Sequence, residues 1–190
     1  MTTNRLEAFS DGVIAIIITI MVLEMKPPHE PNVAALTSLG SAFLSYILSF
    51  IYVGTYWNNH HHLLHAAQKI EGRILWANLH LLFWLSLIPF VTAWMGENHF
   101  AKLPVALYGF VLLMAGIAYY LLAHSLMSQR ENAQLARAIG KDYKGIASII
   151  IYAIAIPLSF LNPWLSFSLY ALVAIMWIIP DRRIEKGIGE

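Results

Sequence analysis

The segment from residue 5 to residue 23 reads RLEAFSDGVIAIIITIMVL, and it decides which class of fold this chain can adopt. A serine and an aspartate lead directly into an apolar run from Gly12 to Leu23. That run would span roughly 18 Å as a helix, which is short of a hydrocarbon core of about 30 Å. Asp11 therefore either starts a membrane helix at the interface or lies below the headgroups, where an ionisable residue marks a functional site.

The rest of the chain shares this apolar character. Of 190 residues, 58% are hydrophobic and 12% are charged, whereas a soluble domain is about 45–50% apolar and about 25% charged. The absence of cysteine excludes disulfides, thiolate metal sites and cysteine nucleophiles. A net charge of +1 gives no basic surface for nucleic acid. The composition predicts an all-α integral membrane protein whose surroundings are the lipid bilayer.

Five further apolar segments follow the first, so that six transmembrane helices are predicted. Their approximate ranges are residues 6–25, 35–65, 73–96, 103–128, 144–161 and 163–180. The last two are separated at Asn162-Pro163, a dipeptide typical of turns. We expect one six-helix transmembrane domain over residues 1–190, and we expect its first helix to be retained, because Glu24 to Pro28 is a poor signal-peptide cleavage site.

The basic residues predict the orientation. With six spans, both termini and the second and fourth loops lie on one side of the membrane. Of the 12 lysines and arginines, only Lys26 and Lys102 fall on the other side. The positive-inside rule then places both termini in the cytoplasm. The fourth loop, residues 128–142, is expected to be either a short interfacial helix or a solvated linker.

A helical projection of the first segment separates an apolar stripe from its polar residues. At 100° per residue one stripe carries the following side chains: Phe9, Gly12, Ile16, Thr19, Ile20 and Leu23. Ser10 and Asp11 fall outside it and point toward neighbouring helices. By itself the stripe is compatible with lipid, with a packed core or with a pore.

The spacing Arg5-x-x-x-Phe9-Ser10-Asp11, followed by an Ile/Thr/Leu-rich span, resembles the start of the transmembrane protein 175 family. This family comprises the endosomal/lysosomal potassium channels and their bacterial homologues, and the bacterial members have a single six-helix repeat of this length. Three weaker motifs add to the likeness: Trp57-x-x-x-His61, Arg73-x-x-Trp76-x-Asn78 and Pro180-Asp181-Arg182-Arg183.

The resemblance implies a homotetramer in the bacterial inner membrane, with four copies of helix 1 around a central pore. It implies a K⁺ channel without a carbonyl filter, constricted by apolar side chains that match Ile16, Ile20 and Leu23. Thr19 matches a hydroxyl that assists potassium selection, and Phe9 and Gly12 line the same pore. Because Ala15 stands where the animal proteins carry a serine, weak selectivity is expected, with other monovalent cations also permeant and no cofactor.

The polar residues of the motif are predicted to form a helix-packing network rather than to bind ions. Its members are Arg5, Phe9, Ser10, Asp11, Trp57, His61 and Asn78, which would hold helix 1 against helices 2 and 3. Two alternatives remain. His61 and His65, at i and i+4, are spaced to bind zinc, and the histidines of helix 2 can respond to pH.

Two functions are therefore considered. The first, which the resemblance implies, is a passive, potassium-selective cation channel. The second is a proton-coupled secondary transporter that uses Asp11 and the helix-2 histidines. Transporters usually have internal repeats and matched broken helices, but the one clear break, around Pro89, has no counterpart in the other half. An enzyme is not expected, because nucleophile-elbow, P-loop and zincin motifs are absent.

Overall fold

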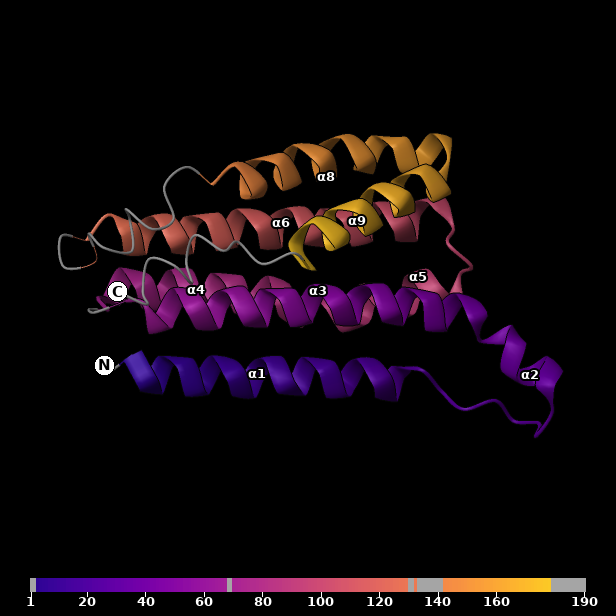
Figure 1. The fold of residues 1–190 in the computed structure, drawn as a ribbon. Helices are drawn as coiled ribbons and strands as arrows, with labels where there is room; N and C mark the ends of the chain where they lie inside the picture. Colours follow the sequence, from indigo (N-terminus) through magenta and orange to yellow (C-terminus); the bar gives the residue numbers. More distant parts are fainter. Residues whose placement is uncertain (1–2, 68–69, 130–131, 133–141, 179–190) are drawn as a thin grey trace.

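The computed structural model describes residues 3–67, 70–129, 132 and 142–178. The elements are α1 (Thr3–Glu24), α2 (Val33–Ser38), α3 (Gly40–His65), α4 (Gly72–Ser86), α5 (Ile88–Glu97), α6 (Lys102–Met127), α8 (Tyr143–Leu161) and α9 (Pro163–Ile178). Successive long helices run in alternating directions, and α2 projects beyond the end of the bundle (Figure 1). Most of the loop 128–142 and the basic ending Pro180-Asp181-Arg182-Arg183 lie outside the described residues.

Two of the predicted helices are interrupted. The range 35–65 is not one helix, because a turn at Leu39 separates α2 from α3, where the Leu39 N–H bonds to the Leu36 carbonyl oxygen over 3.2 Å. Gly40 follows at once and is a weak helix former. The range 73–96 divides into α4 and α5 at Leu87. Pro89 has no N–H to continue the helical ladder, so the break expected around this proline is present.

The helices are those of a membrane protein. Within the part of the chain that the structure describes, four segments are long and apolar enough to cross a bilayer: α1, α4 with α5, α6 and α8, while α9 is apolar but shorter. α3 has the 26 residues of α6 but many more polar side chains. Some of these bond to other helices inside the bundle: the Ser49 hydroxyl lies 2.7 Å from the Thr92 hydroxyl and 3.0 Å from that of Tyr108. The number of spans stays a prediction.

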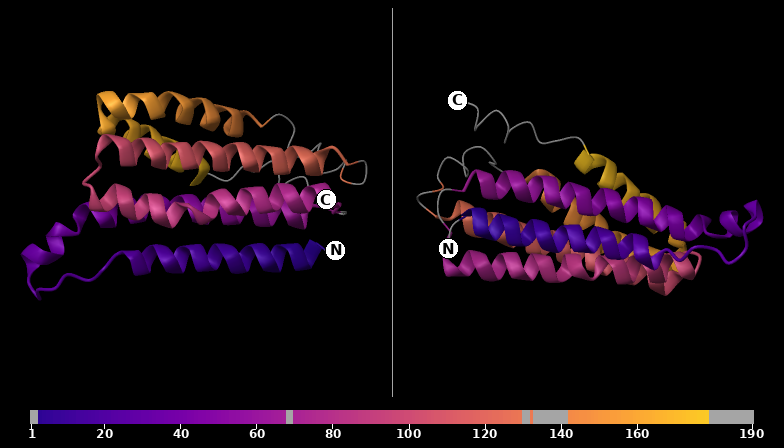
Figure 2. Two further views of the ribbon diagram at one scale, coloured as in Figure 1. Left: turned by 180° about the vertical axis from the view of Figure 1, so that it is seen from behind. Right: turned by 90° about the horizontal axis from the view of Figure 1, so that it is seen from below.

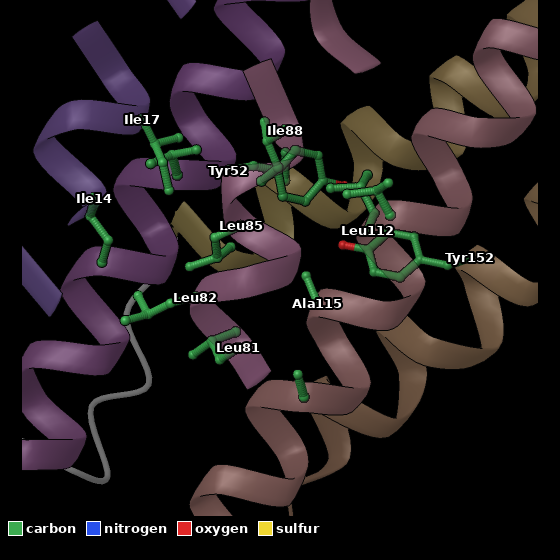
Figure 3. Close-up of a cluster of buried hydrophobic side chains, with 14 of the residues drawn as sticks. Ile14, Ile17, Tyr52, Leu81, Leu82, Leu85, Ile88, Leu112, Ala115 and Tyr152 are labelled. Carbon is green, nitrogen blue, oxygen red and sulfur yellow. The ribbon is translucent and has the colours of Figure 1, made fainter. Parts of the chain in front are cut away.

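Most of the core lies between α3, α4, α5, α6, α8 and α9. α1 forms one edge of the bundle in Figure 1 and, seen from below, lies in front of it (Figure 2). α1 packs on α3, α4 and α5. Ile14 and Ile17 of α1 reach the cluster formed by Leu81, Leu85 and other apolar side chains (Figure 3). The described residues therefore leave one long face of α1 uncovered.

Close packing of α6 on α9 depends on Gly109. A Cβ added at this position would overlap the hydroxyl of the buried Tyr170, which donates to the Val105 carbonyl oxygen over 3.3 Å. We expect Gly109→Ala to lower the free energy of unfolding by about 1–3 kcal/mol through overpacking. The control is Gly54→Ala, where the added methyl meets open space and the helix gains stability. Thermal denaturation in detergent should show opposite shifts for the two variants, and equal shifts would contradict the packing argument.

Candidate pore helix and its polar anchors

One face of α1 is buried against the rest of the subunit. Its members recur every three or four residues, as a single helix face requires: Leu6, Ser10, Ile14, Ile17 and Met21. The serine is the one polar member of this buried set. The rotation of α1 about its own axis is therefore defined by apolar packing along most of its length and by a hydrogen-bonding group near its start.

The opposite face carries the apolar stripe expected from the sequence, and it is exposed along its whole length. Exposed fractions are 50% for Phe9, 60% for Ile16, 41% for Ile20 and 70% for Leu23. Gly12 and Thr19 are also exposed. The Thr19 hydroxyl donates to the Ala15 carbonyl oxygen over 3.0 Å. Since its proton is used within the helix, the lone pairs of this hydroxyl are left facing outward.

Exposed apolar side chains are not confined to α1. Ile154 of α8 is 52% exposed, and Leu172 of α9 is 54% exposed, as expected of helices that face acyl chains. Exposure of the stripe therefore suits either lipid or a second subunit. At its first turns α1 is also held to α3 and α4 by two polar anchors.

The first anchor joins α1 to α4 and α3 through a directed chain of hydrogen bonds. The Asn78 amide Nδ2 donates to the Ser10 hydroxyl over 2.9 Å, and this hydroxyl donates to the Leu6 carbonyl oxygen over 2.8 Å. The Asn78 Oδ1 lies 2.7 Å from Nε2 of His60. Because an amide oxygen only accepts, the His60 proton is on Nε2. The Nδ1 of this buried ring has no hydrogen-bond partner among the described residues.

The second anchor joins a neighbouring side of α1 to α3. The Trp57 indole Nε1 donates to Oδ1 of Asp11 over 3.0 Å. One turn away, Nδ1 of His61 lies 2.6 Å from Oε1 of Glu7. The rings of Trp57, His61 and His65 are stacked in succession, with centroids 6.1 Å and 5.8 Å apart. The i, i+4, i+8 spacing on α3 thus gives a row of rings beside α1.

In the structure, the residues of the expected network do not form a single network. Ser10 with Asn78, and Asp11 with Trp57, form two separate contacts. Phe9 lies on the exposed stripe instead, and Arg5 is exposed and joined to none of these side chains within the part of the chain that the structure describes.

Sequence reasoning missed two residues of the anchors, His60 and Glu7. His60, not His61, reaches Asn78, while His61 pairs with Glu7. The spacing could have indicated Glu7, because this residue precedes Asp11 by four positions and therefore lies on the same side of the helix. For His60 no such signal exists, because three consecutive histidines point in three directions.

The zinc hypothesis gains no support from the geometry. Over the described ranges, no three or more His, Asp or Glu side chains gather closely enough to hold a metal ion.

Fold and site together define an all-helical, multi-pass membrane protein with an exposed apolar stripe on an anchored first helix. The family model described as "Endosomal/lysosomal potassium channel TMEM175" matches residues 5–89. A protein of Chryseobacterium sp. (strain P1-3) named a potassium channel is 54% identical, with all of both chains covered. A potassium channel of Chamaesiphon minutus is 31% identical over 93% of this chain and 94% of its own. The chain belongs to the TMEM175 family.

The solved structures agree. The crystal structure of a "lysosomal potassium-selective channel TMEM175 homolog" from Chamaesiphon minutus superposes with a TM-score of 0.80 at 29% identity, covering 93% of this chain and 96% of that one. The resemblance inferred from the sequence is therefore confirmed. Because this is a family of ion channels, the prediction that the chain is not an enzyme is also confirmed.

Proposed function

We propose that this potassium channel of the TMEM175 family conducts along an axis lined by α1 from four copies of the chain. The observation that carries the proposal is the stripe from Phe9 to Leu23, which is apolar except for Thr19 and is left uncovered by the described helices of its own subunit. A single chain offers one wall of a path. Symmetry-related copies would supply the others, because most oligomers are closed and symmetric.

The proposed constriction consists of Ile16, Ile20 and Leu23. A narrow ring of such side chains excludes a fully hydrated ion, so passage requires partial dehydration or a wider ring. K⁺ releases its water more readily than Na⁺, which gives a modest preference for K⁺. The outward lone pairs of Thr19, between these rings, would replace part of the lost hydration.

In this proposal the two anchors keep the stripe turned toward the axis. Ser10 and Asp11 are consecutive, so their side chains leave α1 about 100° apart. One is held by Asn78 and the other by Trp57. Two fixed directions on one helix determine its rotation, and the stripe then lies on the side that neither anchor uses.

We also propose six spans, with both termini in the cytoplasm of a bacterial cell. The alternating directions of the long helices support this arrangement (Figure 1), as do the lysines and arginines gathered on one side of the predicted topology. Four chains of 21.4 kDa each should be found when the intact complex is weighed by native mass spectrometry.

Family membership favours the channel over the transporter. The contacts of Asp11 point the same way, because its carboxylate accepts from the Trp57 indole, which has no second proton to relay. A coupling carboxylate would instead be expected to reach the histidines directly.

Thiol labelling tests the pore assignment, and the natural chain has no cysteine to interfere. We expect Gly12→Cys to react with a charged, water-soluble methanethiosulfonate and to lose most of its K⁺ flux in liposomes. Gly12 is on the stripe and has open space around it. Ile154→Cys is the matched control, since this exposed residue of α8 would face lipid, where the thiolate does not form. An unreactive Gly12→Cys, or equal labelling of both, would contradict a pore lined by α1.

A further inference from the structure

A row of buried hydroxyl groups crosses the core beside the break between α4 and α5. The Ser49 hydroxyl of α3 lies 2.7 Å from that of Thr92 in α5 and 3.0 Å from that of Tyr108 in α6. The Thr92 hydroxyl also donates to the carbonyl oxygen of Ile88, the first residue of α5, over 2.7 Å. Ser49, Thr92 and Tyr108 are all buried, and we call these three residues the hydroxyl chain.

The hydrogen bonds of the hydroxyl chain have one direction. A hydroxyl group has a single proton, and Thr92 donates its proton to the Ile88 carbonyl oxygen. Ser49 must therefore donate to Thr92, and Tyr108 must donate to Ser49. Each of the three protons has an acceptor inside the bundle, as buried polar groups in a membrane protein require. The hydroxyl chain thus joins α6 to α3 and α3 to α5.

The break between α4 and α5 is a place where the helical backbone gives little support. Pro89 has no N–H, so it cannot donate to the carbonyl oxygen of Leu85, four residues back. A threonine hydroxyl that bonds to the carbonyl oxygen four residues back often bends its helix, and Thr92 bonds to Ile88 in this way. The angle between α4 and α5 therefore depends on side-chain contacts, because the ladder of backbone hydrogen bonds is interrupted there.

The far end of α5 is fixed to α3 by a different contact. A Cβ added at Gly96 would lie 2.6 Å from the Ser45 hydroxyl oxygen and 2.7 Å from the Ala42 Cα, so the two helices approach closely there. The Ser41 hydroxyl donates to the Gly96 carbonyl oxygen over 2.8 Å. Because this contact lies in the last turn of α5, it leaves the end beside the break to the hydroxyl chain.

The break lies at the height of the second half of α1. α1 and α4 run in the same direction (Figure 1), and they meet where Asn78 donates to Ser10. Because both helices rise about 1.5 Å per residue, ten residues further along each one brings Ile20 to the height of Ile88, where α5 begins. α1 packs on α5 as well as on α4. The start of α1 is thus supported by α4, and its second half by α5.

We propose that the hydroxyl chain positions the second half of α1 by holding α5 at a fixed angle to α4. Its members are positioning residues, because they lie in the core whereas the stripe of α1 is exposed. The consequence for conduction rests on the proposed function: with Ile20 and Leu23 at the constriction, a displaced α5 would widen the ring and lower the preference for K⁺. The position of α1 itself is measured without ion flux, so the two proposals can fail separately.

The first test is hydrogen–deuterium exchange of the full-length protein in detergent, followed by mass spectrometry of its peptides. Ser49→Ala removes the middle of the hydroxyl chain. It should raise amide exchange in α5 and in residues 17–24 about threefold, the equivalent of one hydrogen bond between membrane helices. Residues 5–13 should exchange as in the wild type, because both anchors still hold them. Ser86→Ala is the matched control, since this exposed hydroxyl donates to the Phe83 carbonyl oxygen of its own helix.

Thr92 offers a pair of variants that separates the hydroxyl group from the packing. Thr92→Val keeps the shape of the side chain and loses the hydroxyl, so it should raise exchange in residues 17–24 as Ser49→Ala does. Thr92→Ser keeps the hydroxyl and should restore the exchange of the wild type. In liposomes, the ratio of K⁺ flux to Na⁺ flux should fall in Thr92→Val and be retained in Thr92→Ser.

Three results would overturn the positioning role of the hydroxyl chain. They are wild-type exchange of residues 17–24 in folded Ser49→Ala or Thr92→Val, an equal rise in residues 5–13, and a failure of Thr92→Ser to restore exchange. A general loss of stability would give the second of these. Raised exchange confined to α5 and residues 17–24, together with an unchanged ratio of K⁺ to Na⁺ flux, would support the positioning role and contradict the proposed constriction instead.

Discussion

Replacing Ile20 with asparagine is expected to raise K⁺ flux into liposomes about tenfold, which corresponds to a barrier lowered by roughly 1.4 kcal/mol. In the proposed assembly the change introduces one amide from each of four subunits into the narrowest part of the pore. An apolar ring resists water and so resists ions, while amides hydrogen-bond to the water that an ion carries. The preference for K⁺ over Na⁺ should fall at the same time, because a wetter ring demands less dehydration.

The measurement is voltage-driven flux, compared under K⁺ and Na⁺ gradients, from purified protein in liposomes. Leu23→Ser should act in the same direction from a position one turn away. Ile154→Asn provides the matched control. This isoleucine of α8 is 52% exposed, compared with 41% for Ile20, but it does not belong to the stripe. If Ile20→Asn leaves flux unchanged, or if Ile154→Asn raises it equally, the constriction is not on α1.

Replacing Asn78 with leucine is expected to destabilise the subunit by about 2 kcal/mol. The side chain is fully buried and makes two hydrogen bonds, one with His60 and one with Ser10. Single hydrogen bonds between membrane helices contribute about 0.6 kcal/mol on average. A leucine at position 78 also leaves the His60 Nε2–H buried without an acceptor. Such an unpaired donor costs a further 1–3 kcal/mol or so. α1 would also lose one of its two anchors, so we expect the K⁺ flux to fall as well as the free energy of unfolding.

A double-mutant cycle with Ser10→Ala isolates this contact. Thermal denaturation should show that the double variant loses less stability than the sum of the two single variants, because each single change already breaks the bond between Ser10 and Asn78. Strict additivity would mean that the contact is not formed in the folded protein. A stable Asn78→Leu variant with normal flux would mean that the anchor does not hold α1.

Much of the fold was predictable because membrane helices are long and apolar. Each expected range contains helix, although the ranges 35–65 and 73–96 are each divided into two helices, and the Asn162-Pro163 turn separates α8 from α9 as expected. The separation of α2 from α3 was not predicted. The residues from Val33 onward are apolar enough to continue the following span, and the turn at Leu39 depends on local hydrogen bonding that hydropathy does not register.

The two faces of α1 were also predictable, because the period of the helix alone places Ile16, Ile20 and Leu23 on one side. The partners of its polar residues were not. The expected network assigned His61 to the motif, whereas His60 reaches Asn78 and His61 turns to Glu7. Neighbouring positions on α3 differ by 100° in direction, so a small rotation of that helix changes which histidine faces α4.

The sequence by itself determined the class of protein, the approximate places of the helices and the stripe that we assign to the pore, because each depends on hydropathy and on the 3.6-residue period. Tertiary structure decided which histidine meets Asn78, that Glu7 is a partner at all, and that Ser49 lies between Thr92 and Tyr108. These depend on the rotation and the relative height of helices far apart in the chain. Side chains from several helices must fit together to fix those quantities, and no local pattern in the sequence contains them.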